Sequence, residues 1–341
     1  MTSRTRQLLS IVAPVFDEVG GIDAFYERTK AVCEGLTDLD HEIVFVDDGS
    51  TDGSHERLAG IAAADPAVRV LRFSRNFGHQ IAITAGIDHA AGDAVVVIDA
   101  DLQDPPETIV DFVERWREGY DVVYGVRSAR DGETRAKLWT ASLFYRLLRR
   151  FTKVEIPVDV GDFRLMSRRA TSVFRGMREK DRFVRGLVSW LGYRQIGVEY
   201  ARDARFAGQT KYPYRKMVKF AMDGITSFSS APLKLASWMG YLASGLAFLY
   251  LASVFVQKAM GATIQGWATI MVALLFLGGV QLICLGIIGE YIGRIFTEIK
   301  PRPMYVIESM IGETPAVDRN AGEGAGEPSF APRTEPARIV R

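Results

Sequence analysis

The sequence is poor in the residues that mark several common kinds of protein. Its 341 residues include only two cysteines, Cys33 and Cys284, which lie far apart. This argues against a disulfide framework and against a zinc site built on cysteines, so a reducing compartment is the simpler interpretation. The formal net charge is only +1, and the composition therefore gives no support for nucleic acid as a partner.

Two nucleotide-binding motifs are also absent. No Gly-x-Gly-x-x-Gly follows the first apolar run, and no Gly-x-x-x-x-Gly-Lys-Ser/Thr occurs anywhere. The sequence therefore supports neither a Rossmann oxidoreductase nor a P-loop NTPase. The four histidines show no metal-binding spacing, although His79, beside Asn76-Phe77-Gly78, could border a site.

Short apolar runs alternate with helix-like stretches between residues 8 and 127. This alternation predicts an α/β fold with a mainly parallel sheet covered on both faces. The expected strands are 8–15, 42–46, 68–73, 94–98 and 121–126, and the expected helices are 22–36, 55–64, 80–91 and 107–117.

Acidic side chains follow three of these strands where the strands end. In parallel sheets, ligands bind beyond the carboxyl ends of the strands, so we expect these side chains to meet in one crevice. They are Asp17 and Glu18 after the first strand, Asp47 and Asp48 after the second, and Asp99 and Asp101 after the fourth.

Asp99 and Asp101 are the most informative pair. Two carboxylates at the end of a buried strand suit Mg²⁺ or Mn²⁺, which prefer oxygen ligands and bridge to a substrate diphosphate. The alternative is a capped turn before a helix that begins at Pro105 and Pro106, with Asp104 as its N-cap.

Two long uncharged segments appear late in the chain. Residues 235–256 and 259–289 contain no charged side chain, and each is long enough to cross a membrane. We therefore predict an integral membrane protein with transmembrane helices at about 235–256 and 267–288. Basic residues flank the pair and only Lys258 lies between them, which predicts that the catalytic domain and both termini are cytoplasmic.

The predicted organisation has five parts: a catalytic domain, a juxtamembrane amphipathic segment, a transmembrane hairpin, a cytoplasmic return segment and a disordered tail. The tail is rich in Gly, Pro, Glu and Ala and has few large apolar residues. Residues 137–151 mix apolar and basic residues, which fits a helix at the membrane interface or one packed on the sheet. The boundaries of the five parts are 1–210, 211–234, 235–289, 290–310 and 311–341.

Several motifs occur in a fixed order: Val12 to Glu18, Val46 to Asp52, Asn76-Phe77-Gly78, Asp99 to Pro106 and Gly161 to Leu165. This set resembles the motifs of family 2 glycosyltransferases, which have the GT-A fold. With the membrane hairpin, it resembles the polyprenyl-phosphate subgroup, which includes bactoprenol glucosyltransferases and dolichol-phosphate mannose synthases. The resemblance covers about residues 8–307.

The resemblance implies roles for particular side chains on the donor side. It implies that Pro14, Asp17 and Glu18 line a nucleotide pocket and that Asp47 or Asp48 contacts the base or ribose. Asp99 and Asp101 would hold Mg²⁺ or Mn²⁺ on the diphosphate, and Gln103 would orient the diphosphate or the sugar.

On the acceptor side, Asp162 would orient the acceptor and accept a proton modestly; the alternative is a turn residue before a strand. Five cations are candidates for the acceptor phosphate: Arg127, Arg135, Arg164, Arg205 and Lys211. For Arg135 and Arg164, a solvated or ion-paired arginine is an equal alternative. Residues 206–210 look like a loop that closes over the substrate.

The implied reaction is the inverting transfer of one sugar from a nucleotide-diphosphate sugar to polyprenyl phosphate at the bacterial inner membrane. UDP-glucose and undecaprenyl phosphate are the leading pair, membrane lipids are partners, and a homo-oligomer, such as a tetramer, is implied. One alternative is a GDP-mannose-dependent polyprenyl-phosphate mannose synthase. A processive synthase normally carries a Gln-x-x-Arg-Trp motif, which is absent. A different class, a non-catalytic nucleotide-sugar sensor or scaffold, would bind the donor without turnover.

Overall fold

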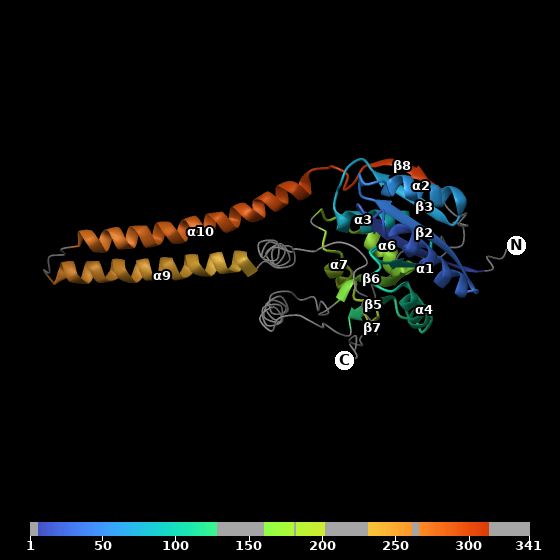
Figure 1. Ribbon diagram of the computed structural model, residues 1–341. Coiled ribbons are helices and arrows are strands. Elements are labelled where there is room, and N and C mark those ends of the chain that lie inside the picture. Colours follow the sequence, from blue (N-terminus) through green and yellow to red (C-terminus); the bar gives the residue numbers. More distant parts are fainter. Residues whose placement is uncertain (1–5, 128–159, 181, 202–230, 261–265, 314–341) are drawn as a thin grey trace. The chain divides into compact units, whose positions relative to one another are not determined.

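A computed structural model describes residues 6–127, 160–180, 182–201, 231–260 and 266–313 (Figure 1). The chain forms two compact units. The sheet unit comprises Met1–Trp139, Val154–Lys211 and Pro303–Arg341, and the hairpin unit comprises Thr140–Lys153 and Tyr212–Arg302.

The sheet unit is built on one eight-stranded sheet with the order β7-β5-β6-β4-β1-β2-β3-β8. The four strands β4, β1, β2 and β3 are parallel, whereas β6 is antiparallel to both of its neighbours and β8 is antiparallel to β3. The strands are β1 Gln7–Val15, β2 Leu39–Asp47, β3 Val68–Phe73, β4 Ala94–Val97, β5 Val122–Arg127, β6 Val160–Ser167, β7 Gln195–Tyr200 and β8 Ile307–Ile311.

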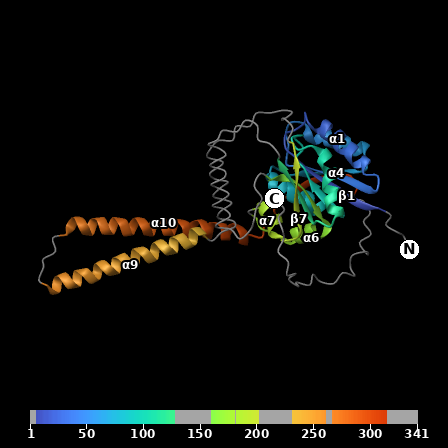
Figure 2. The same ribbon diagram turned by 90° about the horizontal axis from the view of Figure 1, so that it is seen from below.

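Helices cover both faces of this sheet (Figure 2). One face carries α1 (Ile22–Gly35), α2 (Ser54–Ala64) and α4 (Ile109–Arg117), whose apolar side chains join those of alternate sheet residues in one core. The opposite face carries α3 (His79–His89) and α6 (Arg168–Gly176), and α7 (Val184–Trp190) packs against α6 and β6. Because both faces are covered, the buried runs 11–15 in β1, 43–46 in β2 and 94–97 in β4 are wholly apolar.

The predicted α/β fold with a mainly parallel sheet is confirmed. The alternative N-cap role for Asp104 is wrong, because the turn Pro106–Thr108 is a 3₁₀ helix and no side chain caps it or α4. Asp104 is instead buried and accepts a hydrogen bond from the hydroxyl of Tyr200 at 2.5 Å. The strand β8, which begins at Ile307, was not predicted from the sequence.

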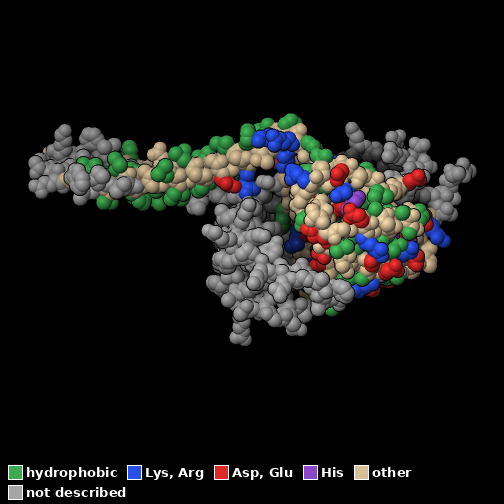
Figure 3. Space-filling model, turned by 45° about the horizontal axis from the view of Figure 1, so that its top comes forward, with side chains coloured by type: hydrophobic (Ala, Val, Ile, Leu, Met, Phe, Trp, Pro, Cys, Tyr) green, Lys and Arg blue, Asp and Glu red, His purple; other side chains and the backbone are tan. Residues whose placement is uncertain are grey.

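The hairpin unit contains α9 (Ala231–Ala259) and α10 (Trp267–Ile299), which contact each other. The Sγ of Cys284 lies 3.3 Å from the carbonyl oxygen of Ala236, which links the two helices. Hydrophobic side chains lie exposed along α10 (Figure 3). Within the described residues, one segment, Val272–Ile299, is long and apolar enough to cross a membrane.

Gly86 sets how closely α3 approaches the sheet. A Cβ added there would stand 2.1 Å from Cγ1 of Val12 and 3.2 Å from Cγ2 of Val46. We expect Gly86→Ala to lower the free energy of unfolding by about 1–3 kcal/mol, because overpacking displaces these side chains. Gly60, in α2 with nothing within 4 Å, is the matched control, and Gly60→Ala should be neutral or stabilising. Thermal unfolding of the purified variants measures both, and equal stability of the two would contradict the close packing.

Candidate active site

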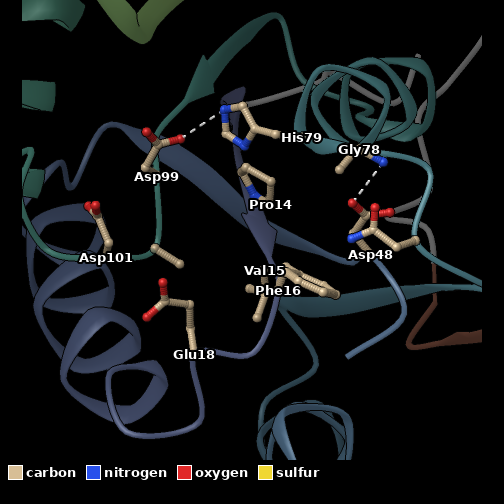
Figure 4. A pocket seen from close by; sticks show the side chains of 12 residues that line it. Pro14, Val15, Phe16, Glu18, Asp48, Gly78, His79, Asp99 and Asp101 are labelled. Carbon is tan, nitrogen blue, oxygen red and sulfur yellow. Dashed lines mark hydrogen bonds and ion pairs between the residues drawn. The ribbon is translucent and has the colours of Figure 1, made fainter. Parts of the chain in front are cut away.

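A pocket of about 310 Å³ opens at the carboxyl ends of β1, β2 and β4. Figure 4 shows Asp99, Asp101 and Glu18 on one side of it and Asp48 on the other, with Pro14 between them. The predicted convergence of acidic side chains from three strand ends is therefore present for Glu18, Asp48, Asp99 and Asp101. The remaining lining residues are Val15, Phe16, Asn76, Gly78, His79, Ala82 and Ala100.

Asp48 is held by backbone amides. Its Oδ1 accepts a hydrogen bond from the amide of Phe77 at 2.6 Å, and its Oδ2 accepts one from the amide of Gly78 at 2.9 Å. Burial raises the pKa of Asp48, and the two amide hydrogen bonds oppose that shift. Two oriented donors fix the direction of the carboxylate, which suits an acceptor for ligand N–H or O–H groups.

Asp99 is an acidic group with few partners. Its Oδ1 is buried and accepts no hydrogen bond from the described residues, while Nε2 of His79 lies 3.5 Å away. Burial raises the pKa of Asp99 to about 6, and the charge of His79 opposes this shift. A buried carboxylate oxygen left in this way fits a cation ligand. Asp101 lies beside it on the pocket wall and accepts a hydrogen bond from the amide of Gln103 at 3.0 Å.

Behind the pocket lies a second acidic group, Asp162 on β6, which is 4 % exposed. Arg185 donates from Nε to its Oδ1 at 3.0 Å and from Nη2 to its Oδ2 at 3.2 Å. Nε2 of His79 lies 3.3 Å from Oδ2, and the side-chain amide of Gln80 donates to the same oxygen at 3.1 Å. Asp162 is thus a paired carboxylate rather than a turn residue.

These partners control the charge of the cluster. Burial alone would raise the pKa of Asp162, but the hydrogen bond from His79 and the charge of Arg185 outweigh it and the pKa is lowered. Burial alone would lower the pKa of His79, but Asp162 and Asp99 outweigh it and that pKa is raised. His79 therefore joins the pocket carboxylate Asp99 to the buried carboxylate Asp162, and a carboxylate with such a low proton affinity is a weak base.

The structure describes two of the five candidate phosphate-binding cations, one of them buried and the other partly exposed. Arg164 is 3 % exposed, donates to the backbone carbonyls of Asp162 and Gly161, and places Nη2 3.7 Å from Oδ1 of Asp162, which is the arrangement of the ion-paired alternative. Arg127 is partly exposed and lies 3.4 Å from the hydroxyl of Tyr200. Its Nη2 lies 2.8 Å from the place where a Cβ on Gly161 would stand, on the face of β6 opposite to the side chain of Asp162. Arg135, Arg205 and Lys211 lie outside the described residues.

Three of the predicted donor-side residues do not line the pocket. The carboxylate of Asp17 accepts a hydrogen bond from the amide of Thr51 at 2.8 Å and so joins two loops. Asp47 is fully buried, accepts from the amide of Ser50 and lies 3.4 Å from Nδ1 of His55. Of the alternatives Asp47 and Asp48, the structure therefore brings Asp48 to the pocket. Gln103 lies next to the lining residues and does not itself line the pocket.

Sequence reasoning missed Arg185. It lies 23 positions after its partner Asp162, at a spacing that no local pattern relates to a strand end. His79 was considered only as a neighbour of the site, although it contacts both acidic groups. The motif Asn76-Phe77-Gly78 was the available signal for it, because it places the start of α3 at the pocket.

Comparison with known proteins identifies the family. Residues 10–174 match the domain "Glycosyl transferase family 2", and residues 231–295 match the "GtrB C-terminal hairpin". The chain is 53% identical over 304 residues to the uncharacterized glycosyltransferase YkcC of Bacillus subtilis (89% of this chain, 94% of the relative). The chain belongs to glycosyltransferase family 2. It is therefore a glycosyltransferase with the GT-A fold followed by a GtrB-type hairpin, as the motifs predicted.

Other relatives carry more specific names. The chain is 42% identical over 301 residues to the SfII prophage-derived bactoprenol glucosyl transferase of Shigella flexneri (88% of this chain, 97% of the relative). Among solved structures, mannosyl-3-phosphoglycerate synthase from Rubrobacter xylanophilus aligns with a TM-score of 0.45 and 18% identity (64% of this chain, 72% of that one). The GtrB-type hairpin and the exposed apolar helix α10 together indicate membrane association.

Replacement of Asp162 tests the balance of charge in the buried cluster. We expect Asp162→Asn to lower the free energy of unfolding by about 3–5 kcal/mol at pH 7, because Arg164 and Arg185 lose their buried counter-charge. The pKa of Asp162 is lowered from its ordinary value of 3.8, so its stabilising effect is complete above about pH 4 and is lost as the pH falls towards the folded pKa.

The measurement is denaturant unfolding of the wild type and the variant from pH 3 to pH 8. The difference between them should be largest near pH 5, should narrow below about pH 4 as Asp162 is protonated, and should decrease as the pH rises through the raised pKa of His79, whose charged form Asp162 stabilises. Asp111→Asn, which changes an exposed carboxylate on α4, is the control, with an expected change below about 0.5 kcal/mol. A difference that widens below about pH 4 would contradict a lowered pKa of Asp162.

Proposed function

We propose that this glycosyltransferase moves one sugar from a nucleotide-diphosphate sugar to polyprenyl phosphate, with inversion at the anomeric carbon. UDP-glucose and undecaprenyl phosphate are the proposed pair. Two observations carry the proposal. The pocket has an acidic wall and lies near the ion pair of Arg185 with Asp162, and the same chain carries a GtrB-type hairpin. The names of the bactoprenol glucosyl transferases among its relatives support the choice of glucose and lipid.

On the donor side, Asp48 would accept hydrogen bonds from the nucleoside, and Asp99 and Asp101 would hold Mg²⁺ or Mn²⁺ on the diphosphate. The Oδ1 of Asp99, which is buried and accepts no hydrogen bond from the described residues, fits this role. Two carboxylates suffice, since these cations complete their coordination with water and phosphate oxygens. When bound, the cation neutralises the charge that collects on the departing nucleoside diphosphate.

On the acceptor side, Arg127 and Arg185 are the proposed guides for the lipid phosphate. Arg185 pairs with Asp162, Arg127 lies at the carboxyl end of β5, and guanidinium groups suit bidentate contact with phosphate oxygens. The phosphate is the nucleophile and is largely anionic near neutral pH, because its second pKa is about 6. Little proton abstraction is needed, which agrees with a low pKa for Asp162 and with a role for this residue in orienting Arg185 and His79.

The hairpin supplies the proposed link to the lipid. Basic residues lie on both flanks of the two uncharged segments, which favours a cytoplasmic location for the sheet unit and for both termini. An acceptor with a long hydrocarbon chain would then present its phosphate at the same membrane face as the nucleotide-sugar donor.

The test is release of nucleoside diphosphate by the purified full-length chain, with a panel of UDP- and GDP-sugars, with and without undecaprenyl phosphate. We expect release with one donor only, and only when the lipid and Mg²⁺ or Mn²⁺ are present. Asp101→Asn should lower turnover by more than about 100-fold, because a ligand of the charge-neutralising cation is weakened. The control Asp111→Asn should leave turnover unchanged.

Three other results would contradict parts of the proposal. Binding of a donor without any release would favour a nucleotide-sugar sensor. Normal turnover in Asp101→Asn would remove the proposed metal role while leaving the transferase activity in place. Release with a GDP-sugar in place of UDP-glucose would change the donor assignment.

A further inference from the structure

The chain that leaves the hairpin becomes the outermost strand of the sheet. β8 pairs with β3 from Val70 to Phe73, and Ile311 packs on the core. The amide of Ser74 donates to the carbonyl of Val306 at 3.0 Å, which extends the pairing beyond the end of β3. This extension leads directly into residues 75–78, the loop that borders the pocket.

Tyr305 joins this returning segment to the sheet unit. Its ring stacks on Phe73 with centroids 5.3 Å apart and an interplanar angle of 17°. Its hydroxyl donates to Oδ2 of Asp88 at 3.0 Å, and Arg178 holds the same oxygen at 2.7 Å. Burial raises the pKa of Tyr305, so the hydroxyl stays protonated as a donor. Tyr305 is therefore fixed at both its ring and its hydroxyl.

Phe73 extends this contact to the pocket. It packs edge-on against Phe77, with centroids 5.5 Å apart, and the guanidinium of Arg75 lies 3.9 Å from the centre of the Phe77 ring. The amide of Phe77 donates to Asp48. Tyr305 thus reaches a pocket carboxylate through two aromatic contacts and one hydrogen bond.

Gly49 holds the loop on its other side. Its φ is +76°, and a Cβ there would stand 2.7 Å from the carbonyl carbon of Arg75 and 2.8 Å from the nitrogen of Asn76. The loop is therefore held on one side by the Asp48–Gly49 turn and on the other by the packing of its Phe77 ring against Phe73. A shift of Phe77 would change the direction in which the Asp48 carboxylate points.

We propose that Tyr305 is a positioning residue for the donor site. It holds Phe73 and Phe77 in place, and this fixes the two loop amides that aim Asp48 into the pocket. The inference rests on the proposed function, because it assigns Asp48 to the nucleoside of the donor. It also means that the donor pocket is complete only after the chain has returned from the hairpin and β8 has paired with β3.

The test uses the full-length protein with Tyr305→Ala, Tyr305→Phe and Met310→Ala. The phenylalanine variant keeps the stacked ring, and Met310 is an exposed residue on β8. Calorimetry with UDP or GDP and Mn²⁺ should show binding about 3- to 10-fold weaker for Tyr305→Ala, as expected for a lost aromatic pair. The other two variants should stay within about twofold of the wild type. In the transfer assay, the KM for the donor should rise in the same ratio while kcat changes little.

Amide hydrogen exchange gives a second readout that does not depend on activity. Tyr305→Ala should speed exchange at the amides of Phe77 and Gly78, while the amides of β4 stay as protected as in the wild type. Faster exchange in β4 as well would show general destabilisation and overturn the positioning role. Unchanged exchange in the loop would overturn it too.

The results separate this inference from the proposed function. Nucleotide binding by the wild type with equal binding by Tyr305→Ala would overturn only the role of Tyr305. Binding of neither nucleotide by the wild type would overturn the proposed donor and, with it, the role of Tyr305 at a donor site.

Discussion

The buried carboxylate of Asp162 is the constraint on which the site depends. A charge that is 4 % exposed is costly unless cations and hydrogen-bond donors surround it. Arg185, Arg164, Gln80 and His79 supply these partners from three different elements. Their contacts with Asp162 also fix the orientation of these side chains. The arrangement that stabilises one buried charge therefore also orients Arg185 and His79.

His79 connects this cluster to the pocket. It lies at the beginning of α3, where the chain turns out of the loop 75–78, and reaches both Asp99 and Asp162. The donor side and the proposed acceptor side therefore share one side chain. The same loop also carries the amides that orient Asp48, and its Phe77 packs against Phe73, the residue on which Tyr305 stacks. Elements distant in sequence thus meet at one short loop.

The sequence predicted the central strands and helices because apolar runs of strand length alternate with helix-like stretches. It predicted Glu18, Asp48, Asp99 and Asp101 at the pocket because parallel strands end at the same edge, and the family resemblance implied Pro14 there. It could not choose between the adjacent residues Asp47 and Asp48, since successive residues point to opposite sides of a strand and register decides which side faces the ligand. Arg185 and β8 were missed because their partners, Asp162 and β3, are distant in the chain and leave no local pattern.

The central claim is that one sugar is joined to a polyprenyl phosphate. The most direct measurement is mass spectrometry of the lipid after reaction of the purified protein with undecaprenyl phosphate, UDP-glucose and Mn²⁺. The account predicts a lipid phosphate that has gained the mass of a single hexose, with none carrying a longer glycan. A lipid of unchanged mass after reaction with every nucleotide sugar in the panel, or a ladder of added sugars, would contradict it.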